Sequence, residues 1–216
     1  MKTLTKEMQA SITPMMALDL LIDGNKRFVN NLKINRNLLQ QANETSDGQH
    51  PFAVILSCID SRTSAELIFD QGLGDIFSVR IAGNIVNEDI LGSMEFGCKV
   101  AGAKIIVVLG HSKCGAVKGA CDHVKMGNLT SLIQKINPAV ESEKQTVENR
   151  NSSNGTFVEN VSAINVKLAV NQIIASSPIL SEMLAKGEIG IVGGMHDISN
   201  GIVTFFNDSM IIKAAQ

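Results

Sequence analysis

Short aliphatic runs with few charges recur through the middle of the chain, at residues 52–57, 76–82 and 104–109. Runs of this length and composition are typical of strands that are buried on both faces, as in parallel sheets. The segments between and after these runs have helical patterns, which predict helices at 63–70, 89–101, 115–126 and 129–136. Strands that alternate with helices predict an α/β fold, with a mostly parallel central sheet and helices on both faces.

The C-terminal third of the chain continues this alternation and then reverses direction. Residues 141–156 are charged and then rich in Asn, Ser and Gly, which indicates a solvated loop or a frayed helix. A helix, a second helix and a strand are predicted next, at 158–176, 178–186 and 188–193. Asn200-Gly201 precedes a last apolar run at 202–206, and this pair between apolar runs favours a tight hairpin. We therefore expect a C-terminal antiparallel strand.

The first 48 residues predict a helical arm that precedes the α/β core. Thr13-Pro14 is typical of a helix start, because the Thr hydroxyl can cap the helix and Pro suits its first position. Residues 35–48 are polar and rich in turn formers, which indicates a connection. We interpret the 216 residues as one domain, with the N-terminal helical arm at 1–48 and the α/β core at 49–216.

Composition narrows the classes of partner. Hydrophobic residues make up 44% of the chain and charged residues only 19%, so we expect part of the surface to lie against another subunit. The net charge is −2, and aromatic residues are 4% with no Trp or Tyr. The chain therefore lacks the excess of basic residues that neutralises phosphates and the aromatic residues that stack on bases. No nucleic-acid partner is expected.

The hydrophobic pattern and the cysteines also indicate the cellular compartment in which we expect this protein. No apolar run approaches the length that spans a bilayer, so we expect no membrane partner. Asp19 and Asp23 interrupt the N-terminal apolar stretch, which argues against a signal peptide. The four cysteines lack the spacing of a disulfide framework. We expect a cytoplasmic protein in a reducing compartment.

Two short fragments together carry a complete set of zinc ligands. Cys58 and Asp60 follow the first apolar run, and His111 and Cys114 follow the third. Two thiols, an imidazole and a carboxylate are all ligands that Zn²⁺ takes in proteins. Functional groups in open parallel sheets gather beyond the carboxyl ends of the strands. With the strand order 2-1-3-4, the first and third strands are neighbours and the two fragments meet in one crevice.

Other interpretations of these fragments remain open. Either fragment alone is compatible with ordinary packing, and we interpret Cys98 and Cys121 as buried apolar thiols. Cys114 could act as a nucleophile with His111 as its base, in a metal-free hydrolase. A non-enzymatic zinc module, with all four ligands permanently engaged, is a second alternative. Zinc content separates the hydrolase from either kind of zinc protein.

A series of short motifs runs along the chain. The two fragments read Cys-x-Asp-x-Arg at 58–62 and His-x-x-Cys-Gly at 111–115. Further motifs are Asp-Gln-Gly-Leu-Gly-Asp, Arg-Ile-Ala-Gly-Asn, Ser-Met-Glu-Phe and Gly-Gly-Met-His-Asp, at 70–75, 80–84, 93–96 and 193–197. Over about residues 14–207, this series resembles the β-class carbonic anhydrases. The resemblance implies a homodimer or a dimer of dimers, with N-terminal helices that embrace the second subunit and active sites at the subunit interface.

The resemblance implies zinc-dependent, reversible hydration of carbon dioxide to bicarbonate and a proton. Cys58, His111 and Cys114 then hold Zn²⁺, and a water in the fourth position attacks as hydroxide. Asp60 binds the metal only in a closed, inactive form. In the open form Arg62 holds Asp60 in a two-pronged ion pair, and the carboxylate can accept a hydrogen bond from the bound water. Carbon disulfide and carbonyl sulfide are alternative substrates for the same chemistry.

The resemblance also assigns a substrate pocket. Gln49 matches a family glutamine before the first strand, whose amide faces the substrate or an anion. Phe77 and Phe96 stand where family members line an apolar pocket suited to carbon dioxide. Because Phe is also a common core residue, ordinary packing is the alternative for both phenylalanines.

The chain departs from part of the family at a regulatory site. Some members bind inhibitory bicarbonate with a Trp, an Arg and a Tyr. Here Ile55 stands at the Trp position and His196 near the Tyr position, which leaves Arg80 without its partners. We therefore do not expect this regulation. The side chains available to carry the proton to buffer are His50, His123 and His196, and the sequence does not choose among them.

Overall fold

The computed structural model describes residues 3–213, and within them five strands form one sheet in the order β2-β1-β3-β4-β5. Strands β1 to β4 pair in parallel, and β5 runs antiparallel to β4. The predicted order 2-1-3-4 and the antiparallel last strand are therefore confirmed. The strand bounds are β1 Ala53–Ser57, β2 Ile76–Arg80, β3 Ile105–His111, β4 Gly190–His196 and β5 Val203–Phe205.

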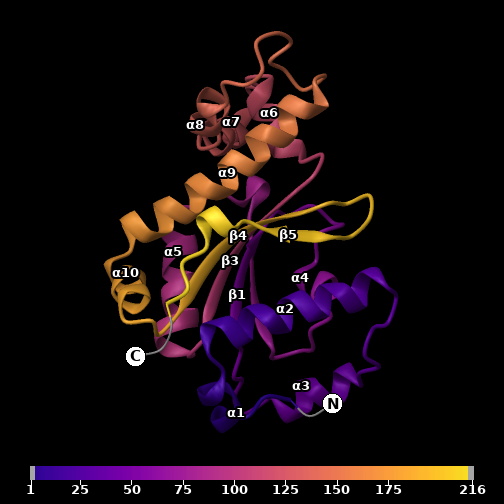
Figure 1. Cartoon of the computed structure of the whole chain (residues 1–216), viewed down its shortest axis with the longest axis vertical. Coiled ribbons are helices and arrows are strands. Elements are labelled where there is room, and N and C mark those ends of the chain that lie inside the picture. The colour runs from indigo at the N-terminus through magenta and orange to yellow at the C-terminus, as the bar shows by residue number, and fades with distance from the viewer. Residues whose placement is uncertain (1–2, 214–216) are drawn as a thin grey trace.

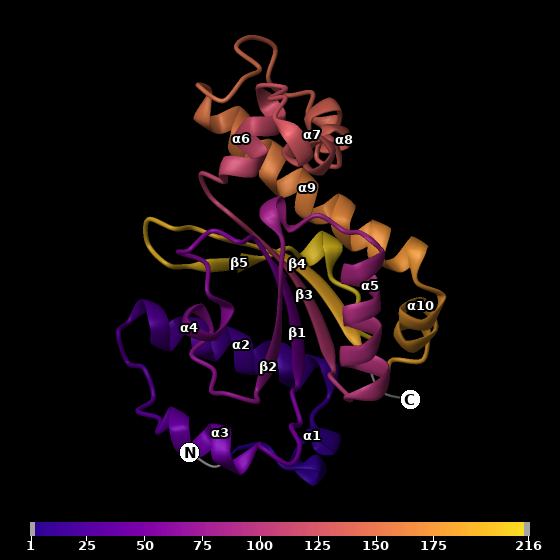
Figure 2. The same ribbon diagram turned by 180° about the vertical axis from the view of Figure 1, so that it is seen from behind.

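Helices cover both faces of this sheet (Figures 1 and 2). Every residue of β1 and β3 is buried, as the continuous apolar runs predict for strands packed on both sides. One face packs against α2 (Pro14–Val29) and α4 (Ala65–Ile68). The opposite face packs against α5, α9 and α10, which span Glu88–Glu95, Gly155–Ser176 and Pro178–Ala185.

A third group of helices lies beyond the carboxyl ends of the strands, at the top of Figure 1. It comprises α6, α7 and α8, which span Gly115–Cys121, Gly127–Gln134 and Asn137–Ser142. These helices share a buried cluster with the first half of α9, and the thiols of Cys58 and Cys114 belong to the same cluster. The chemistry-bearing fragments therefore lie between the sheet and this helical lobe.

The N-terminal arm consists of α1 (Lys6–Ser11), α2 and α3 (Leu38–Glu44). Helix α2 begins as predicted, because the Thr13 hydroxyl accepts the Met16 N–H and Pro14 takes the first position. It continues through Gly24, where a Cβ would lie 1.7 Å from the Phe69 carbonyl oxygen. The glycine thus lets α2 approach α4 closely and cover the sheet of its own chain.

Two segments differ clearly from the elements predicted for them. The helix at 89–101 is split into α5 and a π-helical turn over Phe96–Val100. The Asn-Gly pair lies inside a longer loop rather than a tight turn, since β4 ends at His196 and β5 begins at Val203. Asp197 builds this loop by accepting hydrogen bonds from the backbone and hydroxyl of Ser199 and from the Asn200 amide. Such side-chain bonds offer the backbone an alternative to the two-residue hairpin.

The prediction of a solvated loop or frayed helix at residues 141–156 is confirmed. The start of this segment completes α8, and most of the rest is exposed loop. Glu143 is nevertheless buried, and it binds Arg150 at 2.7 Å. This ion pair ties the loop to the helical lobe.

No single helix in residues 3–213 is both long enough and apolar enough to cross a membrane. The bent pair α9–α10 meets that test only by length and composition.

Candidate metal centre

Cys58, His111 and Cys114 come together at the carboxyl ends of two neighbouring strands. Cys58 follows β1, and His111 is the last residue of β3. Cys114 is the N-cap residue of α6, so it lies just before this helix. One ligand atom from each residue lies within 4.8 Å of the other two. The convergence predicted from the strand order is therefore present.

The three side chains suit a zinc ion. Cys58 is 4% exposed, and His111 and Cys114 are each 1% exposed, so all three side chains are buried. The two sulfur atoms are 4.0 Å apart. His111 Nδ1 lies 2.9 Å from the Ser112 carbonyl oxygen, to which it can donate, while Nε2 is buried and has no partner among the described residues. A histidine with Nδ1 on a carbonyl presents Nε2 to a metal.

The two thiols are electrostatically coupled. The hydrogen bond from Cys114 lowers the pKa of Cys58, against the effect of burial, and His111 and the Gly83 N–H lower it further. The same bond raises the pKa of Cys114, and burial adds to this increase. The contact thus favours the thiolate form of Cys58, and a thiolate is the form that binds metals.

Asp60 is held by Arg62 in a two-pronged ion pair. Arg62 Nε lies 2.9 Å from Asp60 Oδ1, and Arg62 Nη2 lies 2.8 Å from Oδ2. The Arg62 guanidinium holds the pKa of Asp60 well below its usual range, so the carboxylate stays ionised. With both oxygens engaged, Asp60 is not part of the group of converging metal ligands. The geometry corresponds to the open arrangement described above.

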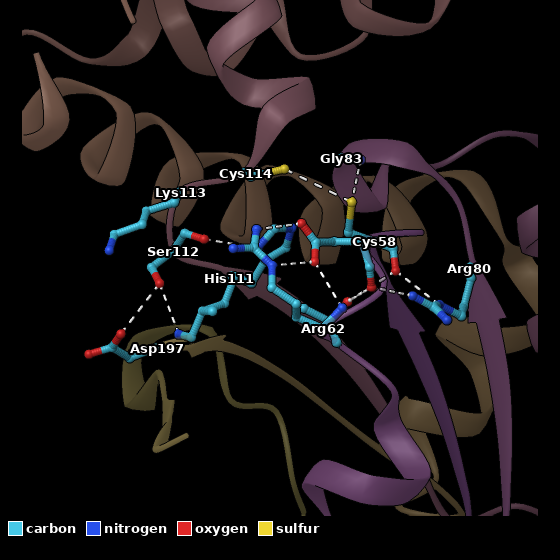
Figure 3. A network of polar contacts seen from close by, with 12 residues as sticks. Cys58, Arg62, Arg80, Gly83, His111, Ser112, Lys113, Cys114 and Asp197 are labelled. Atoms are coloured by element: carbon cyan, nitrogen blue, oxygen red, sulfur yellow. Dashed lines mark hydrogen bonds and ion pairs between the residues drawn. The ribbon is translucent and has the colours of Figure 1, made fainter. Parts of the chain in front are cut away.

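The polypeptide around Cys58 is fixed by contacts that the sequence did not reveal. Arg80 Nε lies 3.0 Å from the Cys58 carbonyl oxygen, and Arg80 Nη2 lies 2.6 Å from the Asp60 carbonyl oxygen. The Gly83 N–H donates to Cys58 Sγ at 3.3 Å (Figure 3). The motif at residues 80–84 signals that this stretch matters, but nothing in it shows which backbone atoms the motif would contact.

Phe77, Phe96 and Gln49, which the resemblance assigns to the substrate pocket, are not among the residues that converge at the candidate zinc site. Phe77 and Phe96 face each other with ring centroids 6.2 Å apart. Both line an open groove of about 800 Å³ between β2 and α5, and none of the three candidate zinc ligands lines it. Gln49 is exposed in the loop before β1. Their roles toward substrate stay predictions.

Ile55, Arg80 and His196 stand at or near the positions that bind regulatory bicarbonate in some family members. Ile55 is fully buried in the core, and Arg80 is occupied by two backbone carbonyls. His196 pairs with His111 in the register of β3 and β4, and burial lowers the pKa of His196 to about 4. His50 is half-buried and His123 is exposed. None of these positions offers the three-residue anion site of the family members described above.

Comparison with known proteins agrees with this geometry. A carbonic anhydrase family model matches residues 53–203. The chain is 33% identical to a carbonic anhydrase of Mycolicibacterium smegmatis, over 88% of this chain and 92% of that protein. It is 34% identical to carbonic anhydrase 2 of Mycobacterium tuberculosis, over 87% of this chain and 90% of that protein.

Solved structures give the same fold. The tetrameric β-carbonic anhydrases of Sordaria macrospora match with a TM-score of 0.68 at 20% identity, over 89% of this chain and 95% of theirs. The converging Cys-His-Cys group lies within the residues matched by the family model. This chain therefore belongs to the β-class carbonic anhydrases, enzymes that hydrate carbon dioxide.

Proposed function

We propose that this chain catalyses the reversible hydration of carbon dioxide to bicarbonate and a proton, with Zn²⁺ held by Cys58, His111 and Cys114. The observation that carries this proposal is the convergence of three buried donors within 4.8 Å of one another. Two sulfurs and one imidazole are a zinc ligand set, and three protein ligands leave a fourth position for water. Membership of the carbonic anhydrase family supports the same reaction.

Zinc in this position would supply a Lewis acid that makes a bound water acidic enough to attack carbon dioxide, the behaviour for which carbonic anhydrases are the standard example. Protein side chains near the metal position would orient the reacting water. Asp60 accepts hydrogen bonds, and with both oxygens facing Arg62 its remaining lone pairs can orient a water. The buried Cys58 and Cys114 side chains would hold the metal from inside the protein.

Arg62 decides whether the site is open or closed. While Arg62 holds Asp60, the carboxylate stays off the metal position, and the fourth place is available. If the pair separates, Asp60 can take that place and close the site. Since hydroxide competes better with a carboxylate at higher pH, the open form is favoured as pH rises.

We further propose that the active unit is a homodimer or a dimer of dimers. The related Sordaria macrospora enzymes are tetrameric. Large apolar side chains are exposed on this chain, among them Leu67, Phe96 and Val100. Apolar area of this kind marks an interaction site on a soluble protein. Each cysteine carries a free, buried thiol, which supports the proposed reducing, cytoplasmic setting.

Two alternatives are less well supported. A metal-free hydrolase needs only Cys114 and His111, and it leaves the converging third donor, Cys58, without a role. A permanently closed zinc module needs Asp60 on the metal, whereas both its oxygens bind Arg62. Carbon disulfide and carbonyl sulfide remain alternative substrates, to be assayed beside carbon dioxide.

The proposal is tested by stopped-flow carbon dioxide hydration with zinc quantified on the same sample, from mildly acid to alkaline pH. About one zinc per chain is expected, with kcat/KM rising as pH rises. The sign follows from Asp60, whose lowered pKa keeps it ionised as a competitor throughout this range, while hydroxide becomes more abundant. Zinc without hydration at any pH would favour the structural module, and a flat pH profile would refute the competition between Asp60 and hydroxide.

A further inference from the structure

One short turn of the backbone donates a hydrogen bond to the sulfur of Cys58. The Gly83 N–H donates to Cys58 Sγ at 3.3 Å, and Gly83 lies in a 3₁₀ turn over Ala82–Asn84 that follows β2. Gly83 adopts φ 69°, the left-handed region that favours glycine. A residue with this much conformational freedom directs its N–H at one atom only if its neighbours restrain it.

Asn165 supplies that restraint. Its Nδ2 donates to the Gly83 carbonyl oxygen at 2.9 Å, from the middle of α9. Asn165 is 5% exposed, so this bond lies in a dry environment where its loss is costly. On another side of the turn, a Cβ at Gly83 would lie 2.6 Å from Ile136 Cδ1. The turn is thus enclosed between α9 and the helical lobe.

We propose that Asn165 is a positioning residue for the metal centre, acting through Gly83 on the Cys58 thiolate. This inference rests on the proposed zinc function of that centre. Asn165 holds the Gly83 carbonyl, and Gly83 in turn presents its N–H to the sulfur. A thiolate that accepts an N–H bond donates less charge to a metal, and a sulfur in a fixed position binds it more tightly.

The contact is distinct from those made by Arg80 and Arg62. Arg80 binds the carbonyl oxygens of Cys58 and Asp60, so it fixes the backbone of that segment. Arg62 binds the Asp60 carboxylate. The Asn165–Gly83 path ends instead on the sulfur, the atom proposed to contact the metal. Loss of Asn165 should therefore change the sulfur–metal bond itself.

The test replaces Asn165 and measures metal binding rather than activity. Asn165→Leu removes the donor at similar volume. Its zinc affinity, measured by competition with a chelator, should fall roughly 10–100-fold, the range typical when an outer contact of a metal ligand is lost. In the Co²⁺-substituted protein the thiolate-to-cobalt charge-transfer band should move to longer wavelength, because the sulfur becomes more electron-rich.

Asn160→Leu is the matched control. Asn160 lies on the same helix, and its amide binds Glu143 at 3.2 Å rather than the turn at Gly83. This variant should lose stability while keeping the wild-type zinc affinity and cobalt band. If Asn165→Leu does not fold, Asn165→Ala replaces it in both measurements.

The outcomes separate the inference from the function on which it rests. Wild-type affinity and an unshifted band in a folded Asn165 variant would overturn the positioning role. Equal changes in the Asn160 and Asn165 variants would also overturn it, since they would reflect general destabilisation. If the wild-type chain itself binds neither zinc nor cobalt at its thiols, the proposed function fails, whatever Asn165 does.

Discussion

Cys58→Ala is expected to abolish zinc binding and carbon dioxide hydration together. Cys58 is one of only three protein donors that converge in the described part of the chain, and both remaining donors lie on the other fragment. With one thiolate and one imidazole left, the site has too few ligands to retain zinc in a tetrahedral arrangement. Zinc per chain should fall close to zero, and the hydration rate should fall to the uncatalysed background.

Cys98→Ala is the control for this prediction. Cys98 is also a buried free thiol, but it belongs to the core cluster under α5, and burial raises its pKa to about 12. A thiol of this kind behaves as a small apolar side chain. The control should cost stability while keeping zinc and activity. Full zinc and wild-type rates in Cys58→Ala would show that the proposed ligand set is wrong.

Arg62→Lys is expected to lower kcat/KM roughly 10–100-fold while the protein keeps its zinc. Arg62 binds Asp60 through Nε and Nη2 at once, and an ammonium group cannot reproduce that planar, two-pronged contact. The freed carboxylate can then take the fourth position on the metal. Stopped-flow assays across pH should show the remaining activity displaced to higher pH, because more hydroxide is needed to compete with Asp60.

Arg150→Lys provides the matched control for that substitution. Arg150 also binds a carboxylate, that of Glu143 at 2.7 Å, but this pair lies in the loop after α8. The control should lower the urea midpoint of unfolding without changing kcat/KM. Wild-type rates in Arg62→Lys would show that the Asp60–Arg62 pair does not govern access to the metal.

The sheet was predictable from the sequence because its strands are buried on both faces. The continuous apolar runs of β1 and β3 are typical of such strands, and every residue of both is buried. The strand order followed from chemistry rather than from hydrophobicity. Cys58 and His111 can share a metal only if β1 and β3 are neighbours, and the structure pairs these strands in parallel.

Contacts between distant segments were not predictable in the same way. Asn165 lies 82 positions from Gly83, and nothing in the pattern of α9 separates its buried amide from an ordinary polar position. Arg80 lacks the Trp and Tyr that accompany this arginine in some family members, and the sequence did not show that it would bind the carbonyls of Cys58 and Asp60 instead. Backbone carbonyls leave no signature in a sequence, so contacts to them emerge only from the fold.

Local turn chemistry accounts for the error near the C-terminus. The Asn200-Gly201 pair has the composition of a two-residue hairpin turn. Asp197 overrides this preference, because its carboxylate gathers Ser199 and Asn200 into a longer loop. The antiparallel direction of β5 was nevertheless predicted correctly, since either connection reverses the chain.

X-ray absorption at the zinc edge of the 216-residue chain tests the central claim most directly, because it reports the atoms bound to the metal. We expect one zinc per chain with two sulfur neighbours at about 2.3 Å, one imidazole nitrogen at about 2.0–2.1 Å and one further light atom. A zinc with four sulfur ligands, or one with no sulfur ligand, would contradict the assignment of Cys58, His111 and Cys114 as the metal centre.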